Sequence, residues 1–136
     1  MSLDELISDN EITNIRILKS DVDGFDYDVI DSSIAVIEKH EPIIFFECYY
    51  DYEYQKISYC NIIRSLESYG YCDWTVFDNF GAIIVRTSDI ETIFQLISYI
   101  WQQKIGLATP TIYYYDIMVV KNKDSALIDK VLEEYI

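Results

Sequence analysis

The chain has 136 residues and a formal net charge of −14, from 24 acidic and 10 basic side chains. This surplus repels nucleic-acid phosphates and anionic lipid headgroups within a screening length of about 8 Å, so we expect neither nucleic acid nor a membrane as a partner. Hydrophobic residues make up 51% of the chain, which excludes a disordered tail and fits one domain over residues 1–136. The first residues do not resemble a secretory signal, and we expect a cytoplasmic protein.

Three cysteines, Cys48, Cys60 and Cys72, are an odd number, and none belongs to a C-x-x-C pair. The chain also has a single histidine. These features favour buried free thiols over a redox or zinc site, and we expect no metal.

The first elements are a short helix over residues 3–7, where Ser2 and Glu5 have the spacing of a capping box, and a strand over 15–18. Pro42 precedes a second apolar strand over 43–46. The segment between the strands is long enough for a crossover, so the two strands should be parallel and adjacent. One helix in this segment is predicted by four residues on one helical face: Tyr27, Ile30, Ile34 and Ile37.

A second crossover helix carries apolar residues from Tyr59 to Tyr69 and ends at Gly70. Strands over 74–77 and 82–85 then flank the turn 78–81 and predict a β-hairpin, which makes the sheet mixed.

An amphipathic helix over 90–101 and a long strand over 112–120 follow, and Asp124 is expected to cap a closing helix. The predicted architecture is an α/β three-layer sandwich.

Carboxylates follow both of the first two strands. Asp21 and Asp23 come after the first, and Glu47 comes directly after the second. The carboxyl ends of neighbouring parallel strands are where open α/β sheets bind ligands, so we predict that these three acids form a catalytic crevice. Tyr49 and Tyr50 follow on a loop beside it and are expected to contact the substrate.

Two other groups are interpreted as structural. Asp26 and Asp28 lie in a first helical turn, where acids complement the helix dipole. Tyr113, Tyr114 and Tyr115 alternate along the last strand and are expected to pack against the sheet.

The run Asp21-Val22-Asp23-Gly24 also resembles the haloacid-dehalogenase-like phosphatases, in which Asp21 would be the nucleophile and Asp23 the acid/base, with magnesium between them. Phe25 stands where those enzymes usually have a small hydroxyl residue. The polar pair Lys19-Ser20 interrupts the strand before the acids, so this alternative is the weaker one.

Five segments in order resemble the carboxyl-terminal half of the FkbM family of S-adenosylmethionine-dependent methyltransferases. They are LDEL at 3–6, KSDVDGFD at 19–26, PIIFFE at 42–47, FDNFG at 77–81 and YDI at 115–117. The resemblance implies a partial Rossmann-like methyltransferase fold, in which the strands over 15–18 and 43–46 are the fourth and fifth. It also implies S-adenosylmethionine as the cofactor and a hydroxyl of a small molecule or glycan as the acceptor. Asp78 and Asn79 lie in one of these segments and are expected to bind the acceptor.

The family binds its cofactor mainly with a glycine-rich turn and an acid on earlier strands. The four glycines of this chain are dispersed and form no G-x-G pattern. We therefore expect an acceptor-side fragment that lacks most of the S-adenosylmethionine pocket and is inactive alone. With its first strand at an exposed edge, such a chain is expected either to form a homodimer across that strand or to cover the strand with a rearranged amino terminus. A non-catalytic assembly module is the alternative function.

Overall fold

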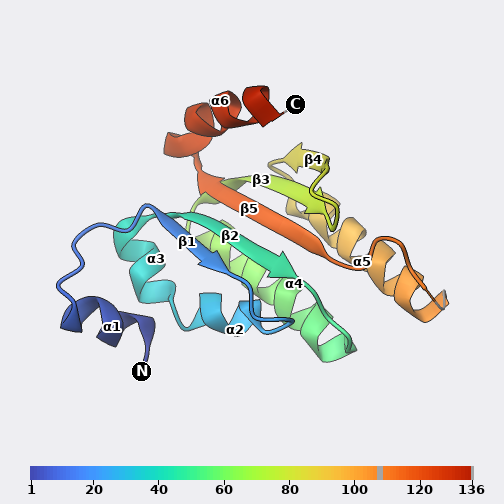
Figure 1. Ribbon diagram of the computed structural model, residues 1–136, viewed down its shortest axis with the longest axis horizontal. Coiled ribbons are helices and arrows are strands. Elements are labelled where there is room, and N and C mark those ends of the chain that lie inside the picture. The colour runs from blue at the N-terminus through green and yellow to red at the C-terminus, as the bar shows by residue number, and fades with distance from the viewer. Residues whose placement is uncertain (107–108, 136) are drawn as a thin grey trace.

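The computed structural model describes residues 1–106 and 109–135. Its strands form one five-stranded sheet in the order β1-β2-β5-β3-β4 (Figure 1). β1 and β2 are parallel, and the other neighbours are antiparallel. The strands are β1 (Ile17–Ser20), β2 (Ile43–Cys48), β3 (Tyr71–Asp78), β4 (Ile83–Thr87) and β5 (Tyr115–Lys121).

Helices lie on both faces of this sheet, as expected for three layers. Residues of α2 to α5 pack on one face, and α6 packs on the other (Figure 1). The parallel pair followed by antiparallel strands is consistent with a partial Rossmann-like methyltransferase fold. The helices are α1 (Leu3–Asp9), α2 (Asp26–Asp31), α3 (Ile34–His40), α4 (Glu53–Ser68), α5 (Ile90–Gly106) and α6 (Ser125–Tyr135), with a 3-10 turn, η1 (Asn122–Asp124), before α6.

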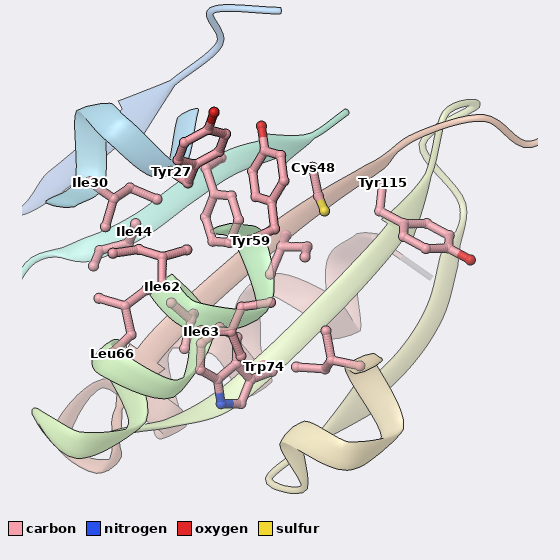
Figure 2. Close-up of a cluster of buried hydrophobic side chains, with 14 of the residues drawn as sticks. Tyr27, Ile30, Ile44, Cys48, Tyr59, Ile62, Ile63, Leu66, Trp74 and Tyr115 are labelled. Carbon is pink, nitrogen blue, oxygen red and sulfur yellow. The ribbon is translucent and has the colours of Figure 1, made fainter. Parts of the chain in front are cut away.

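The main core lies between the sheet and α2 to α5. In β2, every second side chain enters it, and Ile44, Phe46 and Cys48 are at most 1% exposed. Figure 2 shows Tyr59 of α4 and Trp74 of β3 within the same cluster. Because alternate strand residues point to opposite faces, the intervening residues of β2 face the layer of α6.

On that second face, Ile128 and Leu132 of α6 form a smaller apolar cluster with residues of β3 and β5. Arg86 of β4 links α6 to β3. Its guanidinium donates two hydrogen bonds to Asp73, of 2.9 and 2.6 Å, and one of 2.5 Å to Asp129.

The predicted first crossover helix is in fact two helices, α2 and α3. Ser32 and Ser33 separate them, and both hydroxyls donate to the carbonyl of Val29, at 3.0 and 2.6 Å. Serine side chains that bond nearby carbonyls in this way compete with the helical pattern, and apolar periodicity does not reveal it.

Three other details differ from the prediction. The first strand is Ile17–Ser20 rather than residues 15–18, so Lys19 and Ser20 belong to it and do not interrupt it. The closing helix begins directly after Asp124, but that side chain is 7% exposed and accepts a 2.9 Å hydrogen bond from Arg16 instead of capping the helix. The last strand begins at Tyr115 rather than at residue 112. The capping box of α1 is confirmed, because the Ser2 hydroxyl accepts from the backbone N–H of Glu5 and the Glu5 carboxylate accepts from that of Ser2.

The three cysteines are free thiols, although only Cys48 is fully buried. Within residues 1–106 and 109–135, none of the helices has the length and apolar character needed to cross a membrane.

Candidate functional site

A hollow of about 390 Å³ opens at the carboxyl ends of β1 and β2, where a loop follows each strand. It is lined by Asp23, Glu47, Tyr49, Tyr113 and Tyr114. The fold thus brings together acids that lie more than twenty residues apart in the sequence, because parallel strands end at the same edge.

The three predicted acids form one cluster. One carboxylate oxygen from each of Asp21, Asp23 and Glu47 lies within 4.8 Å of the other two. This spacing resembles that of a hard-cation site, but exposed acids commonly gather in this way without an ion. We therefore interpret the cluster as a set of coupled carboxylates.

Both burial and like charges at this distance disfavour ionisation of the Glu47 carboxyl group. Its pKa is raised to about 8, first by burial, then by a hydrogen bond shared with Asp21 and by the charges of Asp21, Asp26 and Asp116. Asp116 faces Glu47 across the β2–β5 ladder, and burial is also the main cause that raises its own pKa. The hollow therefore holds a carboxyl group that can keep or release a proton near neutral pH.

The turn after β1 is shaped by its backbone. Asp23 and Gly24 both have positive φ angles, +51° and +96°, which reverse the chain sharply. A β-carbon at Gly24 would lie 3.1 Å from the amide nitrogen of Gln55 and 3.2 Å from the carbonyl oxygen of Tyr49, so a larger residue would strain the backbone and press on both neighbours. Asp26 is fully buried, and its carboxylate accepts a 3.2 Å hydrogen bond from the N–H of Val22. It holds this turn in place rather than only complementing a helix dipole.

Of the two tyrosines that follow Glu47, only Tyr49 lines the hollow. Its hydroxyl donates to the carboxylate of Asp51 at 3.0 Å. Tyr50 is 1% exposed, and its hydroxyl donates to the carbonyl of Ile97 in α5. The structure thus places Tyr50, two residues beyond the end of β2, in the core and away from the hollow.

Lys104 of α5 contacts the loop after β2, which carries Tyr49 and Tyr50. Its ammonium nitrogen donates to the carbonyl of Tyr50, lies 4.3 Å from the centre of the Tyr49 ring and is 3.7 Å from the carboxylate of Asp51. Burial lowers the pKa of Lys104, against the opposing effect of Asp51. The lysine therefore fixes the loop that carries Tyr49.

Asp78 and Asn79 do not line the hollow. The Asp78 carboxylate accepts from the N–H groups of Phe80 and Ala82 within the turn between β3 and β4. The Asn79 side chain donates to the carbonyl of Thr111 at 3.1 Å and accepts from the N–H of Tyr113 at 3.3 Å. Asn79 thus holds the segment that carries Tyr113, and its effect on the hollow is indirect.

Three residues of the site were not predicted: Asp116, Tyr113 and Tyr114. The tyrosines precede β5 and reach the hollow because the strand begins later than expected. Asp116 carried a usable signal, since it is the only acid in the mostly apolar strand β5. Its register opposite Glu47 depends on β5 lying next to β2, which the sequence did not reveal.

Comparison with family models gives a match to the methyltransferase FkbM domain over residues 1–72, just over half of the chain. The matched part contains β1, β2 and the acids Asp21, Asp23 and Glu47. Comparisons with curated proteins and with solved structures give no match. Nothing in them supports the phosphatase alternative for Asp21 and Asp23. The chain belongs to the FkbM methyltransferase domain family, and it is a methyltransferase domain by that membership.

Proposed function

We propose that the protein takes part in O-methyl transfer from S-adenosylmethionine and that the hollow receives the acceptor hydroxyl. The observation that carries this proposal is the position of Glu47, which lies in the hollow beside Asp21 and has a pKa of about 8. A general base works best when its pKa is near the operating pH.

In this mechanism the acceptor hydroxyl would lose its proton as it takes up the methyl group that bound S-adenosylmethionine would supply. The hydroxyl proton would pass to Glu47 in its ionised form, which a pKa of about 8 makes available near neutral pH. The oxygen must be held in line with the methyl group, and the walls of Tyr49, Tyr113 and Tyr114 are suited to orient it.

S-adenosylmethionine supplies the methyl group when it is bound. Its nucleoside has no obvious place in this chain, because Gly24, Gly70, Gly81 and Gly106 are dispersed and form no glycine-rich turn. We assign no residue to the donor and place only the acceptor side in the hollow.

The acceptor class follows from the lining. Tyrosine rings stack on sugar and other flat or apolar surfaces, and clustered acids repel anions. We infer a neutral acceptor that bears a hydroxyl, either a small molecule or a glycan.

The test is transfer of a labelled methyl group to pairs of neutral compounds that differ in one hydroxyl. Glu47→Gln should lower the rate by about 100-fold. Glu38→Gln, an exposed acid of α3, is the matched control and should change nothing. Equal rates for Glu47→Gln and the wild type would contradict the proposed base.

Donor binding is tested separately by calorimetric titration with S-adenosylhomocysteine. Micromolar affinity, about −8 kcal/mol, would mean that this chain builds a donor pocket, alone or as a dimer. A folded sample without binding would leave the family membership intact and make the chain an acceptor-side or assembly module.

We also propose a homodimer through β1. This strand is at the edge of the sheet, and the Ile17 side chain is 64% exposed on it. Unpaired strand edges favour pairing with another chain. Sedimentation should show a dimer that Ile17→Lys weakens, whereas a wild-type monomer at high concentration would refute it.

A further inference from the structure

Two loops build the acid cluster, and one side chain joins them. The turn after β1 carries Asp21 and Asp23, and the loop after β2 follows Glu47 and carries Tyr49. Gln55, in the first turn of α4, lies between these two loops and is 4% exposed.

Each polar atom of the Gln55 carboxamide has a partner. The oxygen accepts from the backbone N–H groups of Asp51 and Tyr52, at 2.9 and 3.0 Å. The nitrogen donates to the carbonyl oxygen of Gly24 at 3.1 Å. One side of the carboxamide thus holds the loop after β2, and the other holds the turn after β1.

A carboxamide is the group that this position requires. It offers a double acceptor to two backbone donors and a donor to a backbone carbonyl. Buried hydrogen bonds of this kind fix distances, because breaking one leaves a desolvated backbone group without a partner.

From this geometry we propose that Gln55 is a positioning residue that sets the spacing of the carboxylates in the hollow. It does not touch the acceptor, and it acts by holding the loop of Asp21 and Asp23 against the loop that follows Glu47. This proposal rests on the proposed function only for the role of the hollow, since the spacing itself can be measured without substrate or methyl donor.

The readout is the titration of the Glu47 carboxyl group by carbon-13 NMR, assigned with Glu47→Gln. Three acids act on its pKa: Asp21 from the turn after β1, Asp26 from α2 and Asp116 from β5. Asp23 lies within 4.8 Å of the Glu47 carboxylate, and Lys19 acts on Asp116. A change in the spacing of the two loops alters the contribution of Asp21 and leaves that of Asp116 in place.

Gln55→Met keeps the length of the side chain and removes the three hydrogen bonds. We expect the titration midpoint of Glu47 to fall by about one pH unit, as Asp21 moves away and water enters. Exchange of the Asp51 and Tyr52 amide hydrogens should quicken at least tenfold. Gln95→Met, on the exposed face of α5, is the matched control and should leave both quantities unchanged.

Gly24→Ala probes the same contact from the other side, since its β-carbon would press on Gln55 and Tyr49. It should also lower the titration midpoint of Glu47, and it replaces Gln55→Met as the test if that variant does not fold. An unchanged midpoint in folded Gln55→Met, or in Gly24→Ala if the first variant is unfolded, would overturn the proposal. Absence of methyl transfer would count against the proposed function alone.

Discussion

The two faces of β2 differ in the surroundings of their side chains. On one face, Ile44, Phe46 and Cys48 are buried among apolar neighbours. On the other, Phe45 is only partly buried, and the pKa of Glu47 is raised first by burial and then by the acids around it. The same strand therefore contributes side chains to the core and to the candidate site. Because its side chains alternate, the two groups point to opposite faces of the sheet.

The contrast indicates where the molecule tolerates unfavourable interactions. Coupled carboxylates destabilise a fold, and here they are confined to the loops and strand ends around one hollow. The core below them provides the stability that permits this arrangement.

The largest expected effect compares two adjacent phenylalanines. Phe46→Ala should lower the free energy of unfolding by about 4 kcal/mol, because it leaves a cavity in the main core. Phe45→Ala, on the partly exposed face, should cost roughly 1–2 kcal/mol. Denaturant unfolding measures both, and equal losses would mean that the two faces of β2 do not differ as described.

A second prediction concerns pH. Glu47 has a pKa near 8 in the folded protein, against an ordinary value of 4.5. Between these values the unfolded chain releases the proton and the folded chain retains it, so the stabilising effect of that proton is lost as pH rises from about 4.5 to 8.

Glu47→Gln stays neutral and should avoid this loss. Above pH 8 the variant should be more stable than the wild type by about 1–2 kcal/mol, allowing for screening by solvent. At pH 4 the two proteins should be equally stable. Chemical unfolding across pH measures the difference, and a constant offset between the two curves would contradict a raised pKa.

The smallest effect is expected at Asn79. Asn79→Ala removes its bonds to Thr111 and Tyr113 at the rim of the hollow and should lower the free energy of unfolding by about 1 kcal/mol. The amide hydrogen of Tyr113 should exchange faster, and that of Phe46 should exchange as in the wild type. Faster exchange at both positions would show that the hollow and the core are not separate.

Much of the fold was predictable from the sequence because its signals are local. The spacing of Ser2 and Glu5 predicted α1, and the turn before Gly81 predicted the β3–β4 hairpin. The break between α2 and α3 was missed, since it depends on two serine hydroxyls that bond backwards along the chain.

The site was predictable in its acids and in Tyr49. Asp21 and Asp23 follow a strand that could be recognised and Glu47 lies at the end of another, so their meeting was foreseen, and Tyr49 lines the hollow beside them. Tyr50 was predicted to contact the substrate but lies in the core, and Asp116 was not predicted as a residue of the site. The place of Tyr50 depends on where β2 ends, and that of Asp116 depends on which strand lies beside β2. Such long-range pairings leave no periodic signal in one sequence.

The most direct measurement is the carbon-13 titration of the Glu47 carboxyl group in the wild type and in Asp21→Asn. We expect a midpoint near 8 in the wild type and a clearly lower one in Asp21→Asn, because removing the neighbouring charge and the shared proton eases ionisation. A wild-type midpoint near 4.5 that Asp21→Asn does not change would contradict a coupled acid site in the hollow.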